Sequence, residues 1–111
     1  MAETILVVDD DPAIRQVVGF ALAKAGFHIV EAADGLEALV VFGREAPVLV
    51  ILDINMPELS GTDVCRRIRS SSSTPIVFVS SNDDEIDRVL GLELGADDYV
   101  SRSRRATWSR G

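Results

Sequence analysis

Three short runs of consecutive apolar residues lie along the chain, and each of them ends in polar side chains. The runs cover residues 5–8, 48–52 and 76–79. Continuous apolar runs of this length, bounded by polar residues, are typical of strands that are buried on both faces of a parallel sheet. The pattern therefore predicts three central strands of one sheet.

The stretches between these runs have apolar residues at helical spacing. Asp11 and Pro12 suit the start of a first helix, and Leu36, Leu39 and Val40 are expected on one face of a second helix. Further elements are expected as helices over 62–69 and 85–94, and as shorter strands over 27–32 and 99–100. Strands that alternate with helices favour a parallel sheet with helices on both faces.

Length and composition narrow the class of protein. The 111 residues suffice for one domain with a buried core. No segment resembles a membrane span or a secretion signal, and the single cysteine, Cys65, cannot form an internal disulfide. A cytoplasmic location is therefore expected. The net charge of −7 argues against a general nucleic-acid-binding surface.

Carboxylates and hydroxyls directly follow the three apolar runs. Asp9, Asp10 and Asp11 follow the first run, Asp53 follows the second, and Ser80 follows the third. Ligands bind outside the carboxyl ends of the strands in open parallel sheets. We therefore expect a ligand site at this edge of the sheet.

Asp9, Asp10 and Asp53 are expected to converge at this site. Three carboxylates repel one another, so a bound cation would stabilise the cluster. Mg²⁺ suits a few carboxylates together with water and phosphate oxygens. Asp53 could then attack a phosphoryl group as a nucleophile, and Ser80 could donate a hydrogen bond to one of its oxygens. Asp11 is interpreted as a helix cap. Capping alone does not explain why Asp10 and Asp53 both stand at the ends of parallel strands, so these two are interpreted as site residues.

Four motifs occur in the order and spacing of a known family. They are I-L-V-V-D-D-D-P at 5–12, L-D-I-N-M-P-E-L-S-G at 52–61, P-I-V-F-V-S-S at 75–81 and G-A-D-D-Y-V at 95–100. Over about residues 3–100 the chain resembles the CheY-like receiver domain of bacterial two-component response regulators. Residues 84–99 are most similar to the OmpR/PhoB-type members of that family.

This resemblance implies roles for the residues of the acidic cluster. Asp53 matches the phosphoacceptor, and Asp9 and Asp10 match the acidic pair that binds Mg²⁺, with Asp10 as the direct ligand. Asn55 matches the position whose backbone carbonyl completes the metal coordination. The implied fold is an α/β, doubly wound sheet of five parallel strands in the order 2-1-3-4-5.

Ser80 and Tyr99 match the two switch residues of the family, which report phosphorylation to the surface of the fourth helix and fifth strand. The implied function is phosphorelay signal transduction, in which a sensor histidine kinase phosphorylates Asp53. The domain would take part in its own phosphotransfer without being a turnover enzyme. The implied partners are that kinase and a second copy of the chain, docked through the switch surface. No direct contact with DNA or a membrane is expected.

Residues 102–111 depart from the family pattern. Family members continue with Lys-Pro-Phe and a fifth helix, whereas this chain has Arg102 at the Lys position and Ser103 at the Pro position. Arg102 keeps a cation there, but an arginine does not replace a lysine at every task. We therefore expect a receiver domain over residues 1–101 without its last helix, and a basic tail over 102–111 that is disordered or derived from a frameshift.

The codons that can encode residues 101–111 support the frameshift interpretation. Read one base earlier, they can also encode K-P-F-S-P-R-D-L-V-A-R, which is the continuation typical of the family. We expect that an insertion or deletion near Val100 shortened a longer transcriptional regulator. A sheet face without its helix would leave the chain marginally stable, or without function.

Two other classes of function stay open. A pseudo-receiver would act as a protein-interaction module without phosphorylation. A phosphohydrolase of the haloacid-dehalogenase type would use an aspartyl nucleophile in the pattern Asp-x-Asp, whereas this chain has Asn55 at the third position.

Overall fold

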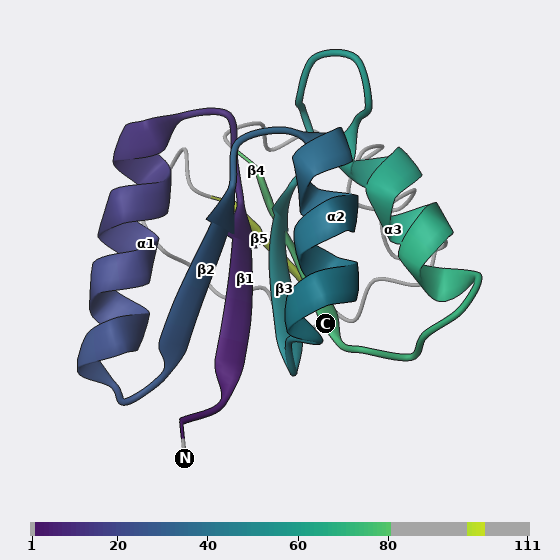
Figure 1. Cartoon of the computed structure of the whole chain (residues 1–111). Coiled ribbons are helices and arrows are strands. Elements are labelled where there is room, and N and C mark those ends of the chain that lie inside the picture. The colour runs from purple at the N-terminus through teal and green to yellow at the C-terminus, as the bar shows by residue number, and fades with distance from the viewer. Residues whose placement is uncertain (1, 81–97, 102–111) are drawn as a thin grey trace.

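The structure is a computed structural model that describes residues 2–80 and 98–101 (Figure 1). The elements in these ranges agree with the alternation that the sequence predicts. In chain order they are β1 (Thr4–Val8), α1 (Pro12–Lys24), β2 (His28–Ala32), α2 (Gly35–Glu45), β3 (Leu49–Asp53), α3 (Gly61–Arg69), β4 (Ile76–Ser80) and β5 (Asp98–Ser101). The helix expected over 85–94 and the tail over 102–111 lie outside the described residues.

The five strands form one parallel sheet in the order β2-β1-β3-β4-β5. This order confirms the predicted α/β, doubly wound fold. Val8 of β1 lies opposite Ala32 of β2 on one side and Leu52 of β3 on the other. The direction in which strands are added reverses after β2, so β1 and β3 border the switch point of the sheet.

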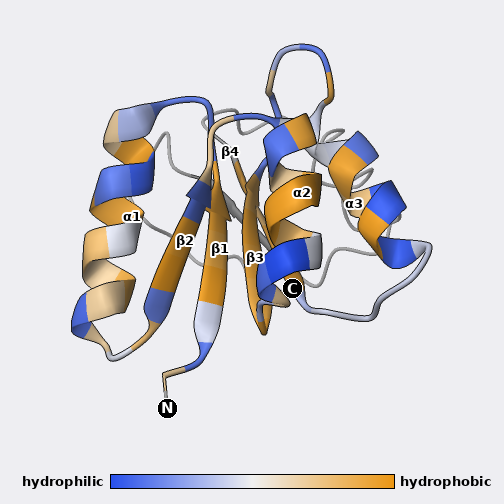
Figure 2. Cartoon of the chain, viewed as in Figure 1, coloured by the Kyte–Doolittle hydropathy of each residue, from blue (hydrophilic) through white to orange (hydrophobic). Residues whose placement is uncertain are grey.

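The main hydrophobic core lies between one face of the sheet and the helices α2 and α3. Leu6, Leu52 and Phe78 from three neighbouring strands are fully buried there. They belong to one cluster with buried residues of both helices, namely Ala38, Val41, Val64, Cys65 and Ile68. Figure 2 shows the corresponding apolar stretches on the central strands and on the helices in front of them.

The face that α2 turns toward the sheet differs from the one that its sequence predicts. Leu36 and Val40 are exposed, whereas Ala38 and Val41 are buried. Leu39 packs against the core as expected, but only in part. This helix is apolar over most of its circumference, so its periodicity does not single out one face. The smaller side chains face the sheet, where they allow the helix to approach closely.

The opposite face of the sheet carries α1. A Cβ atom at Gly19 of α1 would lie 3.4 Å from Cγ2 of Ile29 in β2, so the helix backbone lies close to the strand. Among the residues of α1 only Gly19 is buried. Val77 and Val79 of β4 are half-buried. Within the described residues, this face is therefore covered less completely than the face under α2 and α3. None of the helices in those ranges has the length and apolar character that crossing a bilayer requires.

Each described helix begins at a side chain that accepts a hydrogen bond from its first turn. The Asp11 carboxylate accepts from the Ala13 N–H at 2.9 Å, which confirms the predicted cap of α1. Asp34 accepts from the Glu37 N–H at 2.8 Å, and the Glu37 carboxylate accepts from the N–H of Ala33, the residue before the cap, at 2.8 Å. The two bonds resemble a capping box and fix the turn between β2 and α2.

Two glycines of α2 are expected to respond in opposite ways to a methyl group. A Cβ atom at Gly35 would lie 2.6 Å from the Leu59 carbonyl oxygen, whereas a Cβ atom at Gly43 would meet nothing within 4 Å. Gly35→Ala should therefore lower the free energy of unfolding by about 1–3 kcal/mol. Gly43→Ala should raise it by about 0.5–1 kcal/mol, because alanine is the better helix former. Urea denaturation of both variants measures the difference. A loss of stability in Gly43→Ala, or none in Gly35→Ala, would contradict this packing of α2.

Candidate functional site

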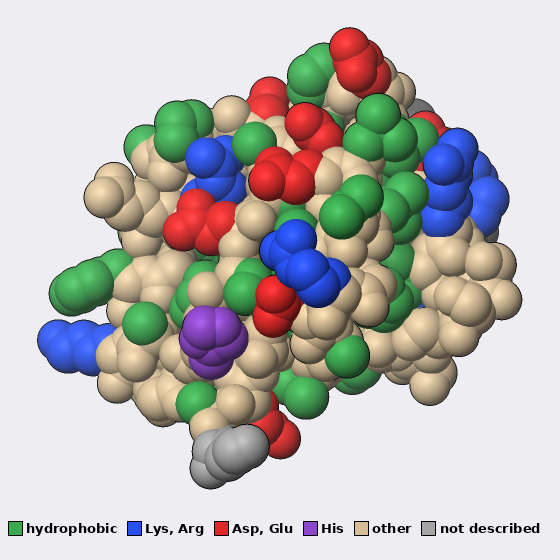
Figure 3. Space-filling model, in the orientation of Figure 1, with side chains coloured by type: hydrophobic (Ala, Val, Ile, Leu, Met, Phe, Trp, Pro, Cys, Tyr) green, Lys and Arg blue, Asp and Glu red, His purple; other side chains and the backbone are tan. Residues whose placement is uncertain are grey.

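Three carboxylates meet where β1 and β3 end. One carboxylate oxygen from each of Asp9, Asp10 and Asp53 lies within 4.8 Å of the others. Val8 pairs with Leu52 in neighbouring parallel strands, so the next residue of each strand reaches the same edge of the sheet. The structure thus brings together the three acids that the sequence placed at one site. On the face shown in Figure 3, many acidic side chains lie toward the upper edge, where the strands of Figure 1 end.

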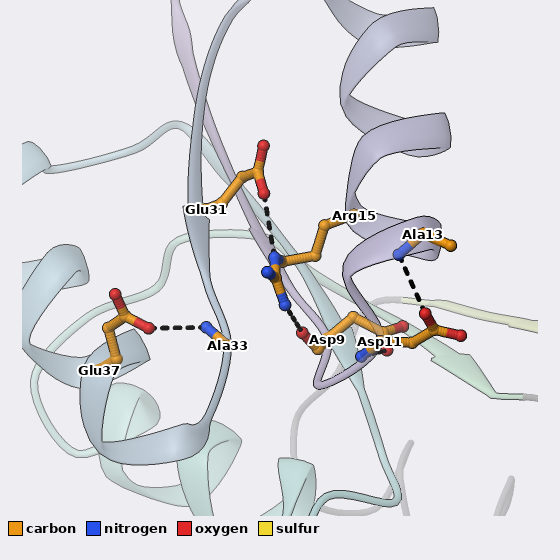
Figure 4. A network of polar contacts seen from close by, with 7 residues as sticks. All are labelled: Asp9, Asp11, Ala13, Arg15, Glu31, Ala33 and Glu37. Carbon is orange, nitrogen blue, oxygen red and sulfur yellow. Dashed lines mark hydrogen bonds and ion pairs between the residues drawn. The ribbon is translucent and has the colours of Figure 1, made fainter.

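Asp9 is held on several sides. The residue is only 2% exposed, and its side-chain Oδ1 accepts a hydrogen bond from the Asp11 N–H at 2.9 Å. Its backbone N–H donates to the Ala32 carbonyl of β2 at 3.2 Å. Its own carbonyl accepts from Nη1 of Arg15 at 2.7 Å (Figure 4). Asp10, the next residue, is exposed.

Asp53 is fixed by the loop that follows it. The residue is 2% exposed, and its Oδ1 accepts a hydrogen bond from the Asn55 N–H at 3.2 Å. The Ile54 N–H donates to the Val79 carbonyl at 3.3 Å, and the Gly61 N–H donates to the Ile54 carbonyl at 2.9 Å. A Cβ atom at Gly61 would clash with the Asp53 carbonyl oxygen. Only a glycine therefore allows the loop to return this closely to the end of β3.

The donor set of this cluster suits a hard divalent cation. All three groups offer carboxylate oxygens, and Asp9 and Asp53 are almost fully buried. Buried carboxylates at such short separation are unfavourable unless a positive charge or hydrogen bonds offset their repulsion. Mg²⁺ prefers oxygen ligands, binds through a few carboxylates and keeps several water ligands. The exposed Asp10 leaves the cluster open toward solvent on its own side.

For Ser80 and Tyr99 the structure gives the position of the backbone in the sheet. Ser80 is the last residue of β4 and pairs with Ser101, one position beyond the pairing of Asp53 with Val79. The strand therefore brings Ser80 to the acidic edge of the sheet. Tyr99 pairs with Phe78 in β5. Arg102 lies outside the described residues. The roles of these residues, and of the Asn55 carbonyl, stay predictions.

Two residues near the site were not predicted from the sequence: Arg15, which contacts the Asp9 carbonyl, and Glu31, which contacts Arg15. Nε of Arg15 donates to Oε1 of Glu31 at 2.9 Å, and the same guanidinium reaches the Asp9 carbonyl. The one available signal was a basic residue in the first turn of a helix that begins directly after three acids. Gly61 was also missed, because its importance depends on the path by which the loop returns.

The order of this sheet, with a site at its β1/β3 switch point, defines a doubly wound protein of the flavodoxin-like class. The chain belongs to the response regulator receiver domain family, whose model matches residues 5–106.

Curated relatives from different organisms support this assignment. The chain is 48% identical over 98 residues to a probable transcriptional regulator ycf27 of Porphyridium aerugineum, an alignment that covers 88% of this chain and 41% of that protein. It is 44% identical over 99 residues to the sensory transduction protein RegX3 of Mycolicibacterium smegmatis, covering 89% and 43%. The chain thus spans a little over two fifths of the length of these relatives.

Solved structures with the same fold include receiver domains and chemotaxis proteins. The BeF3-activated N-terminal receiver domain of Klebsiella pneumoniae RstA has a TM-score of 0.88 and 35% identity, covering 93% of this chain and 88% of that one. The Vibrio cholerae chemotaxis protein CheY4 has a TM-score of 0.87 and 30% identity, covering 95% and 90%. The predicted resemblance to CheY-like receivers is therefore confirmed.

The acidic cluster predicts a response to Mg²⁺ in thermal melting. Mg²⁺ that binds only the folded chain should stabilise it by about 2.7 kcal/mol at 100 times the dissociation constant, and so raise Tm. Asp10→Asn should raise Tm without metal, because it relieves repulsion, and should lose most of the rise with Mg²⁺. Glu45→Gln at the end of α2 is the matched control and should keep the response, because this residue lies near the start of β1, at the opposite edge of the sheet. Differential scanning calorimetry with and without Mg²⁺ measures these changes in Tm. An Asp10→Asn chain whose Tm rises with Mg²⁺ as much as that of the parent would contradict this metal site.

Proposed function

We propose that this receiver domain accepts a phosphoryl group on Asp53 in a reaction that depends on Mg²⁺. The observation that carries the proposal is the convergence of Asp53 with Asp9 and Asp10 at the end of the parallel sheet. Asp9 and Asp10 would hold the metal ion together with Asp53, and the Asn55 backbone carbonyl would complete the protein ligands. The related receiver domain of RstA is known in a BeF3-activated form, which supports the same chemistry here.

The surroundings of Asp53 suit it to nucleophilic attack. Its burial keeps bulk water away from the carboxylate, and the bond from the Asn55 N–H fixes the orientation of the carboxylate group. An oxygen of Asp53 attacks phosphorus, a P–O bond forms, and the bond from phosphorus to the donor breaks. When bound, Mg²⁺ offsets the negative charge of the carboxylate and the phosphoryl oxygens. The chain itself thus contributes two features to the reaction, namely the burial of the Asp53 carboxylate and the fixed loop after β3.

We further propose that the phosphoryl donor is a phosphohistidine of a sensor histidine kinase. The leaving group is then a histidine nitrogen, and the domain undergoes one transfer per phosphorylation rather than turning over a free substrate. Ser80 and Tyr99 would transmit the modification to the surface around β5, where a second copy of the chain would dock. Several relatives are named as probable transcriptional regulators, which supports a role in transcription for the regulator to which this domain corresponds.

Phosphorylation of Asp53 can be tested with a small phosphodonor. Incubation of the chain with acetyl phosphate and Mg²⁺ should add the mass of one phosphoryl group, as measured by intact-protein mass spectrometry. Asp53→Ala should remove the added mass, because no other carboxylate of the cluster lies at the end of β3. Chelation of Mg²⁺ should slow the gain by about 100-fold or more, the scale on which the loss of one charge-stabilising group slows a catalysed reaction.

Glu45→Gln serves as the control for the loss of an acidic group away from the cluster and should be phosphorylated like the parent. Glu45 is the last residue of α2, close to Val48, whose N–H donates to the Thr4 carbonyl at the start of β1. Equal phosphorylation of Asp53→Ala and the parent would contradict the proposal. Absence of phosphorylation in the parent, with Mg²⁺ still bound, would favour a receiver that acts without phosphorylation. Continuous release of phosphate from a generic phosphate ester would instead favour a hydrolase.

A further inference from the structure

Arg15 connects three elements of the fold through one guanidinium group. It belongs to the first turns of α1, and its Nε donates to Oε1 of Glu31 in β2 at 2.9 Å. Its Nη1 donates to the backbone carbonyl of Asp9, directly after β1, at 2.7 Å. The Arg15 side chain is 17% exposed, whereas that of Glu31 is 48% exposed. Figure 4 shows the guanidinium between the Glu31 carboxylate and the Asp9 peptide.

The bond to the Asp9 carbonyl fixes the peptide unit that joins two residues of the acidic cluster. The carbonyl of Asp9 and the N–H of Asp10 belong to one plane. The N–H of Asp9 already donates to the Ala32 carbonyl of β2, so both backbone groups of Asp9 are bonded. Rotation of the Asp9–Asp10 peptide would break the bond to Arg15. The direction in which Asp10 leaves the end of β1 is therefore set in part by Arg15.

We propose that Arg15, oriented by Glu31, is a positioning residue for the divalent metal site of Asp9, Asp10 and Asp53. This inference rests on the proposed Mg²⁺-dependent function of that site. Arg15 acts through the Asp9 peptide and does not itself ligate the metal, since a guanidinium is a cation without an acceptor atom. Glu31 selects the rotamer of Arg15 that reaches the Asp9 carbonyl.

Positioning and electrostatics predict opposite effects of Arg15 on metal affinity. A positive charge near a cation site repels the metal ion, so removal of that charge alone would strengthen Mg²⁺ binding. Loss of a group that orients a metal ligand weakens binding instead, typically by about 10–100-fold. Because the guanidinium contacts a backbone carbonyl of the site at 2.7 Å, we expect positioning to dominate.

A contribution to stability alone would leave metal affinity unchanged in the folded chain. The ion pair of Arg15 with Glu31 is half-exposed on its acidic side, and pairs of this kind contribute little to stability because solvent screens them. A variant that is destabilised far from the site therefore separates the two roles. Ile68→Ala removes buried side-chain atoms from α3, away from the acidic cluster, and serves that purpose.

The experiment measures Mg²⁺ affinity of the 111-residue chain by isothermal titration calorimetry at constant ionic strength, with folding checked by circular dichroism. Arg15→Gln should weaken Mg²⁺ binding by about tenfold. Arg66→Gln changes the net charge by the same amount on the exposed surface of α3 and should bind like the parent. Ile68→Ala, measured below its melting transition, should also bind like the parent.

Arg15→Lys provides a second, milder test. Its ammonium group ends one bond short of the position of Nη1 and lacks the fork that spans two acceptors. Binding should therefore be weaker than in the parent but tighter than in Arg15→Gln. If Arg15→Gln does not fold, weaker binding by Arg15→Lys supports the proposal and parent-like binding overturns it.

The proposal is overturned if folded Arg15→Gln binds Mg²⁺ as tightly as the parent or more tightly. It is also overturned if Ile68→Ala loses as much Mg²⁺ affinity as Arg15→Gln. The loss of affinity would then result from lower stability of the fold and not from the position of Arg15. Failure of the proposed function gives a different result: the parent chain itself shows no Mg²⁺ binding, and the role of Arg15 falls with it.

Discussion

The parallel pairing of β1 with β3 is the constraint on which the site depends. It places the residues after Val8 and Leu52 at one edge of the sheet, and those residues are acids. Their mutual repulsion opposes the arrangement, so burial of the apolar strands must hold together what the charges would separate. The same fully buried strand residues, Leu6, Leu52 and Phe78, form the core under α2 and α3. The core and the site are thus two consequences of one register.

Two short loops convert this register into a defined geometry. The loop after β1 is fixed by the bonds of Asp9 to Ala32, Asp11 and Arg15. The loop after β3 returns to the strand end through Gly61, where a side chain would not fit. Rigid strands with loops that are held by hydrogen bonds suit a site in which a metal ion and a nucleophile must keep a fixed separation.

Much of this arrangement could be predicted from the sequence. Continuous apolar runs identify buried strands, parallel strands share one carboxyl edge, and so Asp9, Asp10 and Asp53 could be placed together without coordinates. Asp11 could be predicted as a cap because its side chain acts on its own turn. The bond from Arg15 to the Asp9 carbonyl could not be predicted. It depends on the rotation of α1 about its axis and on the Arg15 rotamer that the ion pair with Glu31 of β2 stabilises. The prediction of the buried face of α2 was wrong for a related reason. A helix that is apolar over most of its circumference carries little periodic signal to show which face is buried.

The central claim, that the three carboxylates bind one divalent ion at the end of β3, is tested most directly by locating that ion. Crystals of the chain grown with Mn²⁺, which takes the same oxygen ligands as Mg²⁺, give an anomalous signal at the metal position. One strong peak is expected among the carboxylates of Asp9, Asp10 and Asp53, in contact with oxygens of Asp10 and Asp53. No peak at this edge of a well-ordered sheet, with Mn²⁺ bound elsewhere, would contradict it.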